Sequence, residues 1–210
     1  MDKVIREALR YLGYRRGRAS GQEVGEVQAC LEQLRRAVTP RHVYSLWDVS
    51  LGDGTVTLGG VQIASRSLSG HLRGAERAIA FAATLGLGAD RLIKRLSGES
   101  MASAVVANAC ASALIEHYCD EATAAIETGG LFPLPRFSPG YGDFSIQHQA
   151  DLARLTDCAR KIGLTVTDSM LLSPAKSVTA IIGLTREERC APQQCAACGK
   201  TDCPFRRETT

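Results

Sequence analysis

The sequence predicts an α+β fold: a single domain with a largely antiparallel, twisted sheet and flanking helices, followed by a cysteine-rich C-terminal tail. Apolar residues recur at helical spacing in some segments and alternate with polar residues in others. These segments show no sustained alternation of strand and helix, which argues against a parallel sheet. With 45% hydrophobic and 22% charged residues in 210, one domain can bury a real core. We expect residues 1–186 to form the domain and residues 187–210 to form the tail.

The first half of the chain is expected to combine two helices with a hairpin. Residues 2–12 and 22–37 each carry apolar side chains on one helical face. Apolar and polar residues alternate over 43–51, and Asp53-Gly54 then separates this strand from a second one at 55–58. An Asp-Gly pair between two such runs is typical of a hairpin turn. The elements expected next are a short strand at 61–64, a buried strand at 77–85 and a short helix at 90–96.

The second half begins with the longest expected helix, at residues 99–128, whose buried face consists mostly of small residues. Gly129-Gly130 ends this helix. Pro133 and Pro135 are then expected to exclude regular structure as far as Tyr141. The last elements expected are a helix capped by Asp143 or Ser145, running to about Ile162 and closed by Gly163, and strands at 164–167 and 177–184.

Composition excludes several classes of protein. The net charge of +3 is spread along the chain, with one basic cluster at Arg15, Arg16 and Arg18, so nucleic acid is not the expected partner. The most apolar stretches fall short of the roughly 18 residues that a membrane span needs. The N-terminus alternates charged and apolar residues, unlike a secretory signal, and we therefore expect a cytoplasmic protein.

The segment 136–143 is the most informative part of the expected domain. Proline fixes its own φ and glycine accepts positive φ, so Pro139-Gly140 suits a type II turn that leaves backbone N–H groups facing outward. Arg136 adds a bidentate clamp for a carboxylate or phosphate, and Tyr141 adds a ring with a polar tip. These residues suit a small-anion site followed by a helix N-terminus. A structural turn with a solvated arginine is the alternative interpretation.

Arg136-x-x-x-Gly140-Tyr141 resembles the S-adenosylmethionine-binding loop of the activation domain of cobalamin-dependent methionine synthase. The residues 164–178, with Ser173-Pro174 between two expected strands, resemble the strand, proline turn and strand that follow this loop in the family. The helix ending at Ala113 to Glu116 lies where the family has an acidic helix before the loop. The likeness spans about residues 75–185 and is closest to stand-alone versions of the domain.

The resemblance implies a role in methionine biosynthesis, the reductive reactivation of oxidised cobalt with S-adenosylmethionine as methyl donor to reduced cobalamin. It implies a methyltransferase-type accessory in which Arg136 holds the methionine carboxylate of the ligand. Ser138 and Gly140 would contact the ligand through backbone groups. Tyr141 would lie at the cobalamin face and is the candidate catalytic residue.

The positive charge of the ligand needs a carboxylate partner when it leaves water. Glu116 is the first candidate for the family's glutamate, an alignment near Ser112 is the alternative, and Asp48 is the candidate for the family's other acid. The 210 residues leave no room for cobalamin, folate and homocysteine modules. We therefore expect the chain to act in trans on a cobalamin-dependent methionine synthase that lacks its own activation domain, together with an electron donor.

The tail carries the pattern Cys190-x4-Cys195-x2-Cys198-x4-Cys203 and almost no large apolar residues. Such a segment cannot fold by burial, so a metal is its expected organiser. Four thiolates suit an iron-sulfur cluster or zinc, and a tail without metal that undergoes redox chemistry is a third alternative. The proposed reaction needs an electron, which favours the cluster because zinc has no redox chemistry. The other four cysteines are expected in the core, at Cys30, Cys110, Cys119 and Cys158.

Two other functions remain open from the sequence. The first is an iron-sulfur electron-transfer accessory that does not bind S-adenosylmethionine, in which the cysteine tail carries the function. The second is a non-enzymatic interaction module with a zinc-stabilised tail. Ligand binding and metal content distinguish the three.

Overall fold

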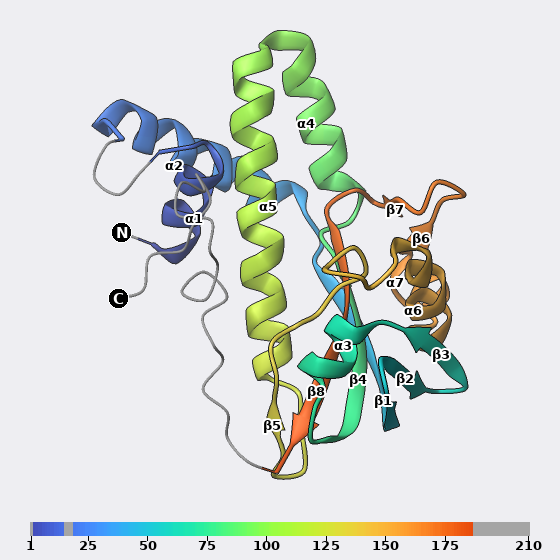
Figure 1. Ribbon diagram of the computed structural model, residues 1–210. Helices are drawn as coiled ribbons and strands as arrows, with labels where there is room; N and C mark the ends of the chain where they lie inside the picture. The colour runs from blue at the N-terminus through green and yellow to red at the C-terminus, as the bar shows by residue number, and fades with distance from the viewer. Residues whose placement is uncertain (1, 15–18, 187–210) are drawn as a thin grey trace. The chain divides into compact units, whose positions relative to one another are not determined.

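The computed structural model describes residues 2–14 and 19–186 (Figure 1). The chain divides into two compact units. Unit 1 contains the described residues before Arg41 together with Leu85–Glu121, and unit 2 contains Arg41–Thr84 and the described residues from Ala122 onward. The basic cluster at residues 15–18 and the cysteine pattern of the tail lie outside the described residues.

Unit 1 is helical, and the sequence explains where its helices begin. The Asp2 side chain accepts a hydrogen bond from the Val4 N–H and caps the first helix. Ser20 and Glu23 form a reciprocal capping box on the second. The helices of the unit are α1 (Lys3–Tyr11), α2 (Gly21–Ala37), α4 (Leu87–Glu99) and α5 (Met101–Ala124), the last of which belongs to unit 1 as far as Glu121.

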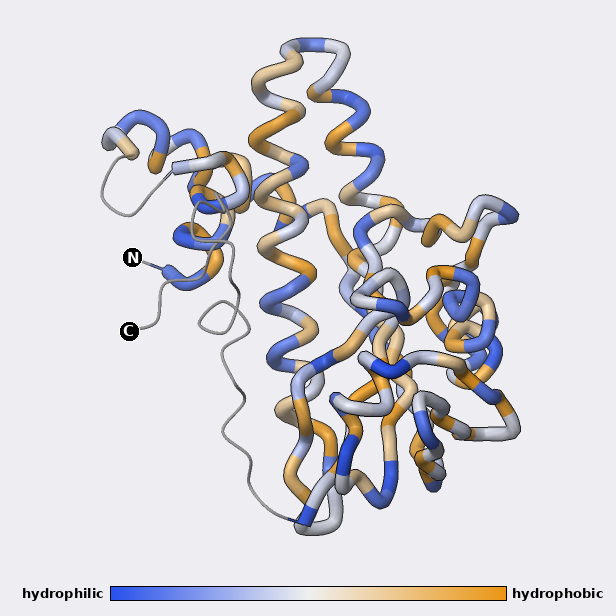
Figure 2. The backbone as a smooth tube through the Cα atoms, in the orientation of Figure 1, coloured by the Kyte–Doolittle hydropathy of each residue, from blue (hydrophilic) through white to orange (hydrophobic). Residues whose placement is uncertain are grey.

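Small residues allow close packing within unit 1. A Cβ added to Gly88 of α4 would lie 1.8 Å from the Ala37 carbonyl oxygen at the end of α2, so only glycine fits there. Apolar positions recur along the whole length of α5 (Figure 2). Cys30, Cys110 and Cys119 are buried and form no disulfide with a described residue, which confirms their expected place in the core.

Unit 2 is built on a six-stranded antiparallel sheet with the order β3-β2-β1-β4-β8-β5. This confirms the expected α+β class and the antiparallel sheet. The Asp53-Gly54 hairpin is also confirmed, because Gly52 pairs with Thr55 and Gly54 has φ +71°. The strands are β1 (Arg41–Gly52), β2 (Thr55–Leu58), β3 (Val61–Ala64), β4 (Ala75–Thr84), β5 (Phe132–Pro133) and β8 (Ser177–Thr185).

Short helices cover one face of this sheet, and the strands and helices enclose a hydrophobic cluster. Its members are Val56, Leu58, Val61, Ile63, Leu68, Leu72, Ala75, Ala78, Ala80, Leu134, Phe137, Phe144, Leu152 and Ile181. Ser45 on β1 accepts a hydrogen bond from the Trp47 indole and donates a 2.8 Å hydrogen bond to the Leu155 carbonyl, which ties the sheet to α6 (Gln149–Thr156). The remaining elements are α3 (Arg66–His71), the 3-10 helix η1 (Ile146–His148), α6 (Gln149–Thr156), α7 (Cys158–Ile162), and a small hairpin of β6 (Thr165–Val166) and β7 (Leu172–Ser173).

Two local expectations are wrong, and one helix was missed. The prolines do not exclude regular structure, because Phe132–Pro133 pairs with β8 at the edge of the sheet, where proline needs no ladder hydrogen bond. The helix expected to reach Ile162 is broken at Asp157, whose φ of 54° is left-handed, a conformation that aspartate tolerates. The short helix α3 was not expected at all.

Candidate ligand-binding loop

The segment Arg136–Phe144 leaves the sheet from a fixed root. Phe137 forms an isolated antiparallel bridge with Ile181 of β8, with both N–H···O distances at 2.9 Å. Its ring is buried and stacks on Phe144, with the ring centroids 6.3 Å apart. The loop is therefore anchored to the central sheet by both backbone and side chain.

His71 at the end of α3 supports the same root. Its ring lies 4.8 Å from that of Phe137, and its Nε2 donates a 2.8 Å hydrogen bond to the Pro135 carbonyl. Burial lowers the pKa of His71, and the hydrogen bond to Pro135 opposes this effect only in part. The imidazole thus acts as a neutral donor that holds the chain just before Arg136.

Two turns shape the loop itself. The Tyr141 N–H donates to the Ser138 carbonyl at 3.1 Å and Gly140 has φ +96°, which agrees with the expected type II turn. The Phe144 N–H donates to the Tyr141 carbonyl, and the Gly140 N–H donates to the Phe144 carbonyl at 2.7 Å. The amides of Gly140 and Tyr141 therefore serve the loop and do not face outward, contrary to expectation. Among the described residues, the Gly140 carbonyl accepts no backbone hydrogen bond and the Ser138 N–H has no acceptor.

Asp143 fastens the far end of the loop to α3. Its carboxylate accepts hydrogen bonds from the Ser65 hydroxyl at 2.5 Å, the Arg66 N–H at 2.9 Å and the Ser67 N–H at 3.0 Å. These hydrogen bonds hold the pKa of Asp143 far below its usual range, and the bond from Ser65 has the largest effect. A Cβ added to Gly142 would lie 2.8 Å from the Ser67 Cβ, so the two backbones approach closely here.

These anchors leave part of the loop at the surface. Tyr141 is 51% exposed, and its ring meets that of Phe137 edge-on at 5.9 Å. Arg136 and Ser138 are half-buried. Ile146 is exposed, and its Cδ1 lies 3.5 Å from the position of a Cβ on Gly140. The loop thus presents a guanidinium, a backbone donor and acceptor, a phenol ring and an aliphatic side chain.

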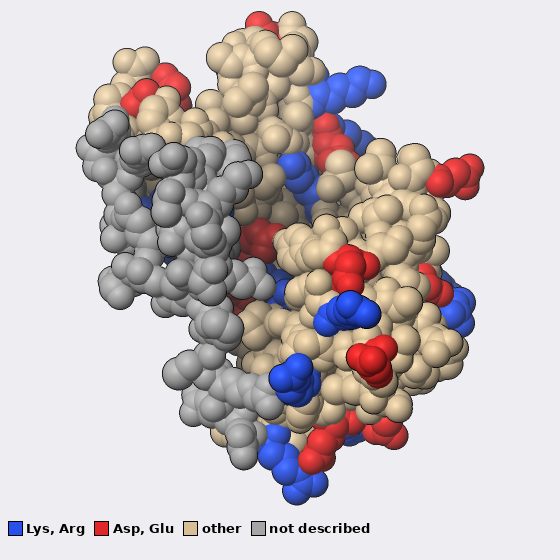
Figure 3. Space-filling view, viewed as in Figure 1, with Lys and Arg blue, Asp and Glu red and all other residues tan. Residues whose placement is uncertain are grey.

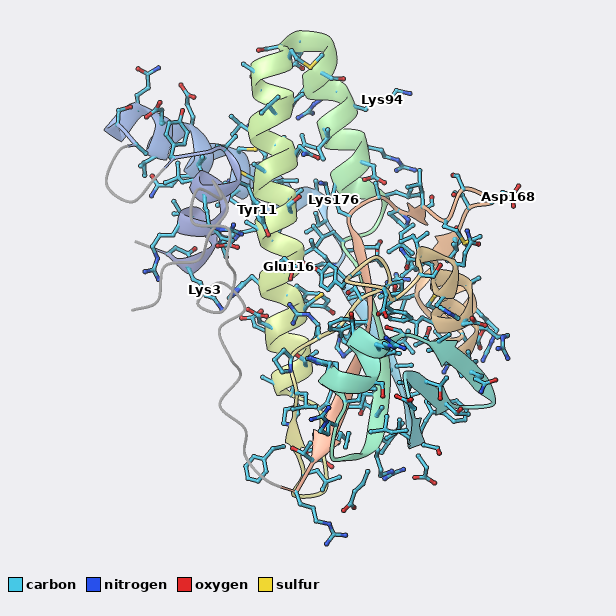
Figure 4. The ribbon with its side chains drawn as sticks, in the orientation of Figure 1. Lys3, Tyr11, Lys94, Glu116, Asp168 and Lys176 are labelled. Carbon is cyan, nitrogen blue, oxygen red and sulfur yellow. The ribbon has the colours of Figure 1, made fainter. Side chains whose placement is uncertain are left out.

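The structure brings Arg136, Ser138, Gly140 and Tyr141 together, because they belong to one anchored turn. Asp48 lies on β1, separated from the loop by β4 and β8 in the sheet, and its 93% exposed carboxylate pairs with Arg77 at 3.3 Å. Glu116 belongs to unit 1, where it is half-buried on α5 (Figure 4). Cys190, Cys195, Cys198 and Cys203, the predicted metal ligands, lie outside the described residues.

Sequence reasoning missed the residues that hold the loop, Asp143 in this role and its partners Ser65, Ser67 and His71. The sequence predicts Asp143 or Ser145 as the cap of the helix that follows, and Ser145 fills that place by accepting from the Gln147 N–H. The sequence offered one signal for α3: Ser65 is a typical helix cap, and it does cap α3 by accepting from the Leu68 N–H at 3.0 Å. Its bond to Asp143 joins residues far apart in the chain, which no local pattern reveals.

Other features of the described residues bear on chemistry. They contain no group of three or more His, Cys, Asp or Glu side chains placed to hold a metal ion. None of their helices is long and apolar enough to cross a membrane. On the face shown in Figure 3, charged side chains of both signs are interspersed over the described surface.

Comparison with known proteins places this fold. No protein-family model matches the chain, and a search of curated proteins finds no match. Among solved structures, the crystal structure of the MetH reactivation domain bound to AdoHcy matches with a TM-score of 0.60 and 14% sequence identity. The match covers 90% of this chain and 78% of that one. The chain thus has the fold of the MetH reactivation domain, which confirms the resemblance drawn from the sequence at the level of the fold.

Proposed function

We propose that the chain binds S-adenosylmethionine at the Arg136–Tyr141 loop and acts in trans to reactivate a cobalamin-dependent methionine synthase that lacks its own activation domain. The observation that carries the proposal is the loop, seated on β8 and α3 by its own contacts in a fold like that of a domain bound to AdoHcy. Such a preorganised loop loses little conformational freedom when a ligand binds.

The groups that the loop presents suit this ligand. The Arg136 guanidinium matches the planar carboxylate of the methionine part. The Gly140 carbonyl can accept from an ammonium group, and the Ser138 N–H can donate to an acceptor of the adenosine part. Tyr141 can lie against the reacting end of the ligand with its exposed ring. The bound ligand would supply a methyl group carried on a sulfonium.

The acidic partner of the ligand remains part of the proposal. Glu116 and Asp48 are its two candidates, and Asp48 already has its charge matched by Arg77. Comparing Glu116→Gln with Asp48→Asn in ligand titrations decides between them, because the true partner should cost the larger loss of affinity.

The cysteine tail completes the proposed role. Cys190, Cys195, Cys198 and Cys203 would hold an iron-sulfur cluster, whose one-electron chemistry suits delivery of an electron from a separate donor. Anaerobic purification followed by iron, sulfide and zinc analysis tests this. Iron and sulfide with a reducible visible band support the cluster, whereas one zinc per chain and a colourless protein reject it.

Calorimetric titration of the full chain with S-adenosylmethionine and with AdoHcy, under anaerobic conditions, tests ligand binding. Arg136→Ala should weaken binding by about 2 kcal/mol or more, roughly thirtyfold, because a charge-assisted bidentate pair is lost. Arg91→Ala, at an exposed position of α4, is the matched control and should bind as the parent does. Absence of heat from the parent, or equal affinity of Arg136→Ala, contradicts the proposal.

Action in trans has its own assay. An oxidised methionine synthase without an activation domain is mixed with this chain, S-adenosylmethionine and a one-electron reductant. Activity should return only when all components are present, and Arg136→Ala should slow the return. Full recovery without the chain would contradict its role as the reactivation partner.

A further inference from the structure

A cavity of about 380 Å³ lies in unit 2, between the β1–β2 turn and α3. Its lining includes the turn residues Gly52 to Gly54, Ser69 and Gly70 of α3, and two arginines, Arg66 and Arg73. Its volume falls at the lower end of the range of small-molecule sites. We propose that this cavity binds a compact anion with two or more acidic groups, a phosphate ester or a polycarboxylate.

The two arginines carry the proposal. Neither Arg66 nor Arg73 forms an ion pair with any residue that the structure describes, although Arg77 and Arg186 elsewhere in the same unit do. Two cations that line one cavity repel each other unless an anion lies between them. An arginine fork also matches phosphate and carboxylate oxygens geometrically. The cavity therefore favours a ligand that can bond both guanidinium groups at once.

Arg66 is held in place for this role. Its backbone N–H donates to Asp143, and its Cγ lies 2.9 Å from the position that a Cβ on Gly54 would occupy. Gly54 has φ +71°, so the turn needs glycine there, and the aliphatic stem of Arg66 can pack directly against it. With the stem fixed, the guanidinium loses less freedom on binding.

Other lining groups shape the specificity. The Ser69 hydroxyl donates to the Gly52 carbonyl at 3.2 Å and joins α3 to the turn. Gly70 has no side chain, and a Cβ there would meet no atom within 4 Å, so this part of the lining leaves space for a ligand. Asp53 is the acidic residue of the lining and repels an anion. Because Asp53 offsets part of the positive charge of the two arginines, a ligand with one negative charge should bind weakly and a ligand with several negative charges more tightly.

Titration of the full chain with pyrophosphate and, separately, with citrate tests the proposal in a low-salt buffer free of other polyanions. At least one probe should bind with one-to-one saturation, and the stronger probe distinguishes a phosphate ester from a polycarboxylate. Arg66→Gln and Arg73→Gln should each weaken binding about tenfold or more. Glutamine retains the Cβ and Cγ that pack on the turn. Asp53→Asn should strengthen binding.

The control is Arg91→Gln, which removes an exposed arginine of α4 outside the cavity and should leave both titrations unchanged. Urea unfolding of each variant separates loss of the site from loss of the fold. Absence of saturable binding by both probes, or an equal loss in Arg91→Gln, would overturn the proposal. AdoHcy binding tests the loop independently of this cavity: Arg66→Gln should leave it unchanged, because the variant retains the backbone N–H that bonds Asp143.

Discussion

Replacing Gly142 with alanine tests how tightly the candidate loop, Arg136–Phe144, is seated on α3. Gly142 has φ +57°, which is left-handed, and a Cβ there would lie 2.5 Å from the Ser67 Oγ and 2.8 Å from the Ser67 Cβ. The hydroxyl can rotate away, but the Cβ is fixed to the backbone of α3. The substitution must therefore displace either the loop or the helix.

Two costs add in this variant. A left-handed alanine costs about 1–2 kcal/mol. Forcing an extra methyl into a packed contact costs about 1–3 kcal/mol more. The free energy of unfolding should therefore fall by about 2–5 kcal/mol. Because Asp143 follows directly, the displacement should also stretch its bonds to Ser65 and Ser67 and weaken AdoHcy binding.

Gly60→Ala is the matched control. Gly60 also has a left-handed φ, +77°, but a Cβ there meets no atom within 4 Å, so its variant carries the conformational cost alone. Urea unfolding of the parent and both variants isolates the contact with Ser67, and calorimetry with AdoHcy reports on the loop. Gly142→Ala should lower the free energy of unfolding less in a Ser67→Gly background than in the parent, because the contact with the Ser67 side chain is then absent. Equal destabilisation by Gly142→Ala and Gly60→Ala, with unchanged AdoHcy affinity, would refute the close seating of the loop.

Three further predictions concern the same anchors. Phe137→Ala should lower the free energy of unfolding by about 3–5 kcal/mol in urea titrations, because a buried ring is lost. If the same substitution at an exposed phenylalanine lowers it more, Phe137 does not belong to the core. Because the pKa of His71 is lowered in the folded chain, the unfolded chain binds a proton more readily at this residue. The free energy of unfolding should therefore fall as the pH drops below about 6.5, and His71→Phe should remove that component of the pH dependence. Asp143→Asn should weaken AdoHcy binding in calorimetry, since an amide in place of the carboxylate loses the charge-assisted bonds; in the parent these bonds should survive acidification until the pH falls through the depressed pKa of Asp143, below its usual 3.8.

Local sequence signals predicted most of the elements of unit 2. The Asp53-Gly54 pair located the β1–β2 hairpin because its turn type demands those residues. The alternating and continuous apolar runs located β3, β4 and β8 to within a few residues, since each strand buries a defined face. The Pro139-Gly140 turn was likewise predictable from residue chemistry.

Contacts between distant segments account for what was missed. Short α3 has too few residues to show a periodic pattern, and its position depends on Asp143 reaching back to Ser65. The pairing of Phe132–Pro133 with β8 requires a free sheet edge, which only the strand order reveals. The candidate loop could therefore be located from sequence, but the residues that hold it could not.

The most direct test of the account is a titration of the isotope-labelled chain with AdoHcy, followed by amide and side-chain NMR. The account predicts that saturable shifts concentrate at Arg136, Ser138, Gly140 and Tyr141, with a large shift of the Ser138 amide because its N–H has no acceptor among the described residues. Saturable binding whose shifts leave this segment unmoved, or no binding at all, would contradict the central claim.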